Sequence, residues 1–258
     1  MKKLLLGNEA IARGAYEAGV RVSSAYPGTP STEINENVAT YPEIYSEWAP
    51  NEKVAVEVAL GAAVSGARSL ACMKHVGLNV AADPFFTATY TGVNAGMVVV
   101  VADDPGMHSS QNEQDTRMLA RASHAPVLDP SNSQECKDFL KLAYEISEKY
   151  DTPVILRVTT RIAHARTLVE LDERVEVPLR EYKRDIKKYV SMPANMIARH
   201  LYVEEREKKL AEDANTLPIN RIEWADRKIG VITSGAAYNY VKEAMPTASV
   251  LKLSLIHI

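Results

Sequence analysis

Up to about Thr160, short apolar runs alternate with longer amphipathic stretches, and this alternation is the feature that most narrows the fold. The apolar runs are rich in β-branched residues or continuously apolar, as strands buried on both faces of a parallel sheet are. We therefore predict an α/β layered domain with a mostly parallel sheet. The predicted strands are residues 20–25, 69–75, 97–102 and 154–159, and the predicted helices are residues 9–18, 31–39, 52–68, 78–90, 113–121 and 134–150. The expected N-caps include Asn8 and Ser133, and Gly19 and Gly66 lie near helix ends.

The chain divides into three predicted parts, residues 1–165, 166–225 and 226–258. The middle part is dense in charge, which predicts an extended linker followed by an exposed helix at residues 195–212. A dedicated partner surface is the alternative for this part. The last part predicts a strand, a helix at residues 236–244 and a second strand, the truncated start of a second α/β domain. Its final residues, 253–258, resemble translated sequencing-adapter read-through, so we expect an artefactual end.

Composition excludes several classes of protein. The net charge of -3 gives no reason to expect nucleic acid as a partner. No run approaches the roughly 20 apolar residues needed to cross a bilayer, and Gly7 ends the apolar start too early for a signal peptide. Cys72 and Cys136 are far apart and cannot hold an iron–sulfur cluster by themselves. These features predict a cytoplasmic protein with reduced thiols and no membrane contact.

One carboxylate stands alone in an apolar helix. Glu57 is the only charged residue in the run from Val54 to Val64. A helix that is apolar nearly all round belongs in a core or a tight interface, where a carboxylate must be paired, protonated or used. The alternative is a solvated stripe, in which Lys53 and Glu57 form an i,i+4 pair.

Two polar loops directly follow predicted strands, where ligands bind in open α/β sheets. Residues 26–33 (YPGTPSTE) contain prolines that fix the loop, and Thr29 offers a hydroxyl. Residues 73–79 (MKHVGLN) contain His75, a donor for a carboxylate or carbonyl, and Gly77, which permits close approach of a ligand. A rigid turn and a hydrogen-bonded loop histidine are the structural alternatives.

A third polar loop, residues 102–115, follows the strand predicted at 97–102. Such a loop often lines a site. Asp103, Asp104 and His108 are candidate metal ligands, but their spacing fits no known ligand pattern, and an Asp-Pro-Gly turn explains much of it. We therefore expect no metal site in the chain.

The three loops come from the same edge of the predicted sheet, so we expect them to converge with Glu57. Together, these loops and Glu57 resemble the N-terminal part of the large (alpha) subunit of the indolepyruvate:ferredoxin oxidoreductases, thiamine-diphosphate enzymes of the 2-oxoacid:ferredoxin oxidoreductase superfamily. The resemblance covers residues 4–253 and is most specific in residues 73–84 and 102–117. It also rests on residues 7–10, residues 26–33, and Glu57 with Gly66 nine positions later.

The resemblance implies that residues 1–165 are a pyrimidine-binding domain for thiamine diphosphate and that residues 226–258 begin a transketolase C-terminal-like domain. Glu57 would bond to the aminopyrimidine ring of the cofactor and exchange a proton with it. The remaining implied cofactor contacts are Tyr26, Pro27, Gly28, Thr29, Gly77 and Asn79. The implied substrate contacts are Lys74, His75, Asp104, His108, Gln111 and Asn112.

The implied reaction is the oxidative decarboxylation of indole-3-pyruvate, or another aryl pyruvate, to the acyl-CoA with reduction of ferredoxin. The implied partners are a smaller beta subunit and ferredoxin, in a dimer of heterodimers. Mg²⁺ and 4Fe–4S clusters are expected only from a C-terminal part outside this chain, so the chain alone is expected to be inactive.

The chain departs from related pyruvate enzymes at the third loop. Those enzymes carry an arginine near its start to hold the substrate carboxylate, whereas this chain has Asp103-Asp104-Pro105. The carboxylate would then need another donor, such as Lys74 or His75. The alternatives are a different 2-oxoacid:ferredoxin oxidoreductase subunit and a non-catalytic assembly module of the same fold.

Overall fold

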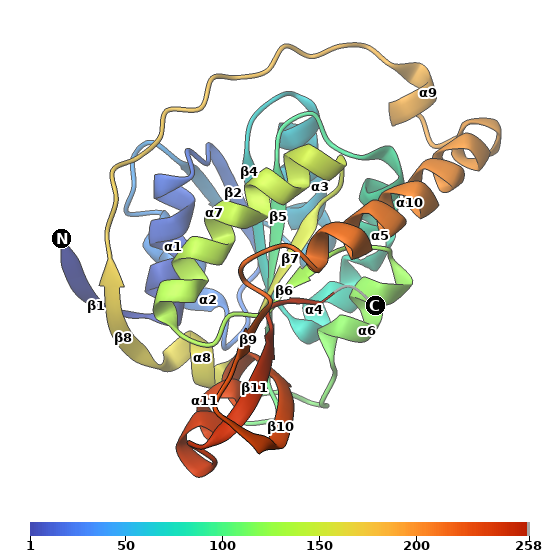
Figure 1. The fold of residues 1–258 in the computed structure, drawn as a ribbon. Helices are drawn as coiled ribbons and strands as arrows, with labels where there is room; N and C mark the ends of the chain where they lie inside the picture. The colour runs from blue at the N-terminus through green and yellow to red at the C-terminus, as the bar shows by residue number, and fades with distance from the viewer. Residues whose placement is uncertain (257–258) are drawn as a thin grey trace.

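The computed structural model describes residues 1–256 and contains a central sheet of seven strands (Figure 1). All neighbouring strands run parallel except the edge strand β12, which is antiparallel to β6. This confirms the predicted fold class. In spatial order the strands are β12 (Leu255–Ile256), β6 (Val127–Leu128), β7 (Val154–Thr159), β5 (Met97–Asp103), β4 (Ser69–Lys74), β2 (Val22–Ala25) and β3 (Tyr45–Trp48).

Helices cover both faces of the sheet and form two apolar cores. In α7, the apolar positions recur every three to four residues, so one side of the helix packs against α1 and the sheet. The helices of the first core are α1 (Gly7–Glu17), α2 (Thr32–Val38), α7 (Ser133–Tyr150) and α8 (Thr160–His164). The helices of the second are α3 (Glu52–Val64), α4 (His75–Val80), α5 (Ala82–Thr91) and α6 (Thr116–Ala122). Among residues 1–256, no helix combines the length and apolar character needed to span a membrane.

The four predicted strands are confirmed to within two residues, but one predicted helix is wrong. Residues 78–90 form parts of two helices, α4 and α5, that meet at Ala81. Pro84 has no N–H to donate to the carbonyl of Val80, so the helical ladder is interrupted there. The short strands β3 and β6 were not predicted, because their runs are too short or too polar to stand out.

Both predicted N-caps are wrong. The helix α1 begins at Gly7, so Asn8 lies inside it, and its side chain donates to the carbonyl of Pro30 (2.8 Å) and to Glu33 (3.0 Å). The cap of α7 is Asn132, whose side chain accepts from the backbone N–H of Glu135 at 2.9 Å. Asn8 therefore connects the first helix to the loop that follows β2.

The middle part of the chain is tied to the first at several points. Strand β8 (Arg166–Glu170) pairs antiparallel with β1 (Lys2–Leu6), and the chain then runs in an extended form to α9 (Ile186–Tyr189) and α10 (Pro193–Ala214). The helix α10 is not simply exposed as predicted, because it buries Arg206, which donates to the carbonyls of Thr89 (2.9 Å) and Asp151 (3.1 Å). Burial lowers the pKa of Arg206 to about 10.

Limited proteolysis is expected to cut first after Lys183 or Arg184. Both residues are exposed and lie in a stretch without secondary structure, where local opening costs little free energy. Brief trypsin treatment followed by mass spectrometry should show two fragments that meet there, and replacing both residues by glutamine should delay the cut. A first cut within residues 1–160 would contradict this expectation.

The last part forms a small sheet in the order β10-β11-β9, with one helix. Lys252 is fully buried and donates to the Ser131 hydroxyl (2.8 Å) and to the Glu135 carboxylate. Gly235 has φ +51°, and a Cβ there would lie 2.6 Å from the Asp129 carboxylate, so only glycine fits. These contacts dock the small sheet onto the first part. Its elements are β9 (Arg221–Glu223), β10 (Asp226–Ser234), α11 (Gly235–Ala244) and β11 (Ala248–Leu253).

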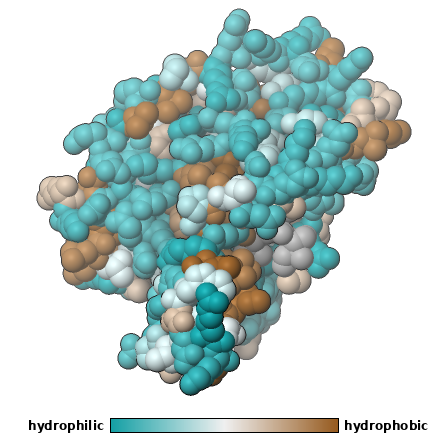
Figure 2. Space-filling model, in the orientation of Figure 1, coloured by the Kyte–Doolittle hydropathy of each residue, from teal (hydrophilic) through white to brown (hydrophobic). Residues whose placement is uncertain are grey.

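The small sheet leaves much apolar surface in the open. The exposed fractions are 66% for Trp224, 51% for Ile229 and 70% for Ile232, and Figure 2 shows hydrophobic residues gathered on this lobe. Such a patch is typical of a surface that another part of a protein covers. Residues 253–258 were expected to be an artefactual end. Within them, Leu255 and Ile256 pair with β6, whereas His257 and Ile258 lie outside the described residues.

Candidate functional site

Three loops meet at the carboxyl edge of the sheet, as predicted. They follow β2, β4 and β5, and they are residues 26–31, 74–79 and 104–115. The Ser109 hydroxyl donates to the carbonyl of Thr29 at 3.3 Å, and the Lys74 ammonium donates to the carbonyl of Ser109 at 2.9 Å. The third loop therefore lies across the other two.

The first loop is held by its own backbone. The Ser31 hydroxyl and N–H both donate to the carbonyl of Gly28, at 2.7 and 2.8 Å, so Ser31 occupies the cap position of α2 without capping it. A Cβ at Gly28 would come within 3.0 Å of the Lys74 side chain. The side chains of Tyr26, Pro27 and Thr29 are exposed and free to meet a ligand.

In the second loop, His75 is buried and donates through Nε2 to the carbonyl of Asn112 at 3.0 Å. Its Nδ1 is also buried and has no hydrogen-bond partner among the described residues. Gly77 was expected to admit a ligand, but the structure gives another reason for glycine. A Cβ there would lie 2.5 Å from Oε1 of Glu52. Asn79, also predicted at the cofactor, is exposed.

The third loop is organised around Asp104, which is buried. Its carboxylate accepts from the Ser109 N–H and from the hydroxyls of Ser110 and Thr160, each at 2.8 Å. Burial acts to raise the pKa of Asp104, but these hydrogen bonds outweigh it and lower the pKa to about 2. Asp104 therefore shapes the loop with its charge, whereas His108, Gln111 and Asn112 are exposed.

A buried charge network lies under the third loop. Arg157 of β7 is 7% exposed and donates to Asp103 at 2.6 Å and to Asp129 at 3.3 Å. Asp103 also accepts from the Thr116 N–H at 3.2 Å, which fixes the start of α6. Both aspartates considered as metal ligands thus have protein partners, and no group of three His, Cys, Asp or Glu residues within 1–256 is placed to hold a metal ion.

Glu57 is exposed, which excludes a position in the core of this chain and agrees with an interface or a solvated helix face. The helix α3 packs through Ala55, Val56 and Ala59, which leaves the side bearing Glu57 uncovered. The ammonium of Lys53, the pairing partner in the alternative interpretation, instead bonds to Asp83 at 2.9 Å and interacts with Glu57 only through its charge. A nearly all-apolar helix with one open side is typical of a surface that a ligand or another subunit covers.

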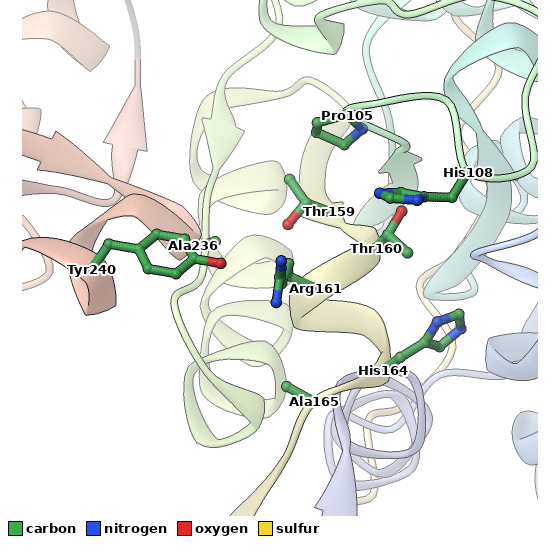
Figure 3. Close-up of a pocket in the computed structure, with 9 residues that line it drawn as sticks. All are labelled: Pro105, His108, Thr159, Thr160, Arg161, His164, Ala165, Ala236 and Tyr240. Atoms are coloured by element: carbon green, nitrogen blue, oxygen red, sulfur yellow. The ribbon is translucent and has the colours of Figure 1, made fainter. Parts of the chain in front are cut away.

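A cavity of about 650 Å³ lies at the end of β7, between α8 and α11 (Figure 3). Of its lining residues, only His108 was predicted from the sequence as a site residue, although the turn after β7 also lies at the carboxyl end of a parallel strand, as the three loops do. The part contributed by α11 gave no signal, because it depends on how the small sheet docks. The lining residues are Pro105, His108, Thr159, Thr160, Arg161, His164, Ala165, Ala236 and Tyr240.

A mostly parallel sheet with polar loops gathered at its carboxyl edge defines a ligand-binding α/β domain. Residues 13–220 match the family model described as pyruvate flavodoxin/ferredoxin oxidoreductase, thiamine diphosphate-binding. The chain therefore belongs to this thiamine-diphosphate-binding family.

Curated relatives place it more closely. The chain is 50% identical to indolepyruvate oxidoreductase subunit IorA of Pyrococcus horikoshii, over 95% of this chain and 39% of that protein. It is 48% identical to the subunit of the same name from Methanothermobacter marburgensis, over 98% of this chain and 43% of that protein. The chain thus spans about two fifths of the length of these relatives.

A solved structure agrees on the fold. The 2-oxoglutarate:ferredoxin oxidoreductase of Magnetococcus marinus, with 2-oxoglutarate, coenzyme A and succinyl-CoA bound, superposes with a TM-score of 0.80. The match covers 98% of this chain and 54% of that chain, at 20% identity. At that identity the likeness concerns the fold alone.

Proposed function

We propose that this chain is the N-terminal part of a thiamine-diphosphate enzyme subunit that oxidises indole-3-pyruvate, or another aryl pyruvate, to the acyl-CoA. The observation that carries the proposal is the exposed carboxylate of Glu57 on the open side of α3, in a chain of the thiamine-diphosphate-binding family. The names of the relatives in Pyrococcus and Methanothermobacter support the choice of substrate.

The residues present fit the pyrimidine end of the cofactor. A Cβ added at Gly61, one turn beyond Glu57, would meet nothing within 4 Å, so a flat ring can lie against α3 without displacing protein atoms. When bound, thiamine diphosphate supplies an electron sink for decarboxylation. Glu57 would hold or release a proton at its carboxylate oxygen, facing the ring, and Thr29 would offer its hydroxyl at the end of β2.

The loops would surround the substrate. Lys74 is a buried cation beside Gly28 of the first loop, and its ammonium donates to the carbonyl of Ser109. The free Nδ1 of His75 is an acceptor for a substrate or water hydrogen. The third loop, whose shape Asp104 maintains, would cover the bound substrate and exclude water from it.

The remaining parts of the reaction would come from outside this chain. A domain for the cofactor's diphosphate and Mg²⁺, 4Fe–4S clusters, a smaller beta subunit and ferredoxin complete the proposal, in a cytoplasmic dimer of heterodimers. The open side of α3, which bears Glu57 and Gly61, and the exposed apolar residues Ile229 and Ile232 of β10 are surfaces in this chain that such parts would cover.

The complete enzyme is expected to prefer indole-3-pyruvate over pyruvate by about 10- to 100-fold in kcat/KM, because burying an aromatic side chain contributes about 1.5–3 kcal/mol. Reduction of ferredoxin with coenzyme A present measures this, with 2-oxoglutarate as a second comparison. Equal or higher efficiency with pyruvate would refute the aryl assignment and favour another 2-oxoacid oxidoreductase.

A further inference from the structure

The cavity between α8 and α11 contains hydrogen-bond donors that no protein group uses. The guanidinium of Arg161 makes no hydrogen bond or ion pair with residues 1–256, and it lies 6.0 Å from the centre of the Tyr240 ring. In Figure 3 the hydroxyls of Thr159 and Tyr240 and the guanidinium of Arg161 point toward one another. Arg161 alone brings five N–H donors and no acceptor.

Thr159 provides an independent sign of a missing ligand. It is 8% exposed, and its hydroxyl is buried without a hydrogen-bond partner. A buried hydroxyl of this kind costs about 1–3 kcal/mol when it stays unpaired. A ligand that accepts a hydrogen bond in the cavity would remove that cost.

The carboxylates around the cavity are already engaged. Asp104 accepts from Thr160, Glu33 lies 3.6 Å from the His164 ring, and Asp129 faces Arg157. None of them neutralises Arg161. The cavity therefore presents an uncompensated positive charge beside neutral donors, which is the arrangement that recognises an oxyanion.

The cavity is also larger than an oxyanion needs. Its volume of about 650 Å³ lies within the usual range for small organic ligands. Tyr240, Ala236 and Ala165 give it an apolar wall with an aromatic face. These walls suit a planar ring attached to the anionic group.

We propose that this cavity is a binding site for an oxyanion joined to a planar ring, with Arg161, Thr159 and Tyr240 as its donors. Two reactants of the proposed function have this chemistry, and the inference rests on that function only for these candidates. One is the phosphate-bearing adenosine end of coenzyme A, and the other is indole-3-pyruvate through its carboxylate. The cavity also includes Pro105 and His108, so it adjoins the third loop.

Calorimetric titration of the 258-residue chain tests the site without turnover. The probes are adenosine 3′,5′-bisphosphate and indole-3-pyruvate, each against the unchanged chain, Arg161→Gln and Tyr240→Phe. Charge-assisted hydrogen bonds of this kind are worth about 10- to 100-fold in affinity, so Arg161→Gln should weaken binding by that factor and Tyr240→Phe by less. The matched control is Arg184→Gln, an exposed arginine in the extended segment.

Saturable binding of either probe that weakens in Arg161→Gln but not in Arg184→Gln supports the site, and the probe that binds identifies the source of the anion. Absence of saturable binding, or equal affinity in Arg161→Gln, overturns it. Thermal unfolding of each variant checks that the fold is retained, and Tyr240→Phe provides a second test if Arg161→Gln is unstable. Failure of the proposed function would appear separately, as a lack of turnover by the complete enzyme with aryl pyruvates.

Discussion

Replacing Glu57 by glutamine in the complete enzyme is expected to lower kcat about 10²–10⁴-fold, the usual contribution of a general acid–base group. Glutamine keeps the size of the side chain, so folding should survive, but it cannot exchange a proton with the cofactor ring. Hydrogen–deuterium exchange at the thiazolium carbon of the bound cofactor should slow in parallel with turnover.

Because Glu57 is exposed in this chain, its replacement should change turnover without a large effect on folding. In the 258-residue chain alone, where Glu57 lies on a solvated helix face and Lys53 is bonded to Asp83, the substitution should cost less than about 1 kcal/mol of stability. Glu43→Gln is the matched control, because Glu43 is exposed and lies outside the three loops. Near-normal turnover and exchange in Glu57→Gln would favour the non-catalytic assembly module. Glu52, which packs against Gly77, would then be the next carboxylate to test.

The sequence predicted the sheet and the meeting of the loops because both follow from local patterns. The run Met97–Val101 is continuously apolar, and a buried parallel strand requires little else. Once strands are parallel, the loops after them share one edge, so the loops could be expected to meet, and the contact of Ser109 with Thr29 is one instance of that meeting.

The features that were missed depend on contacts distant in the sequence. The helix α3 is apolar on nearly every side, so its pattern does not show which side faces the sheet, and it could not tell a core position of Glu57 from an interface or a solvated one. Gly77 lies so close to Glu52, 25 positions earlier, that a Cβ would not fit, and the local sequence does not show this contact. The cavity beside Arg161 needs Tyr240, whose position depends on the docking of Lys252 into a buried polar pocket.

The buried position of Arg157 predicts the second large effect. Arg157→Met is expected to lower the free energy of unfolding by about 3–5 kcal/mol, because it leaves buried aspartates without their cation. Methionine fills similar space, so the decrease in the free energy of unfolding should come mainly from the lost charge and not from lost volume. The matched control is Arg117→Met. The Arg117 side chain is 33% exposed, and its pairing with Asp115 should be worth about 0–1 kcal/mol.

The loss caused by Arg157→Met should depend on pH in a direction that Asp129 sets. Burial raises the pKa of Asp129, and the nearby Arg157 opposes that rise, so removing Arg157 raises the pKa further. A folded-state pKa above the unfolded value stabilises the fold at low pH, and that stabilisation disappears as the pH rises through the folded pKa. The deficit relative to the unchanged chain should therefore be largest near neutrality and smaller at about pH 5, where Asp129 gains a proton more readily. Urea unfolding of both chains at the two pH values measures the difference. An equal stability deficit at both pH values would mean that the packing of Arg157, and not its charge, stabilises the structure beneath the third loop.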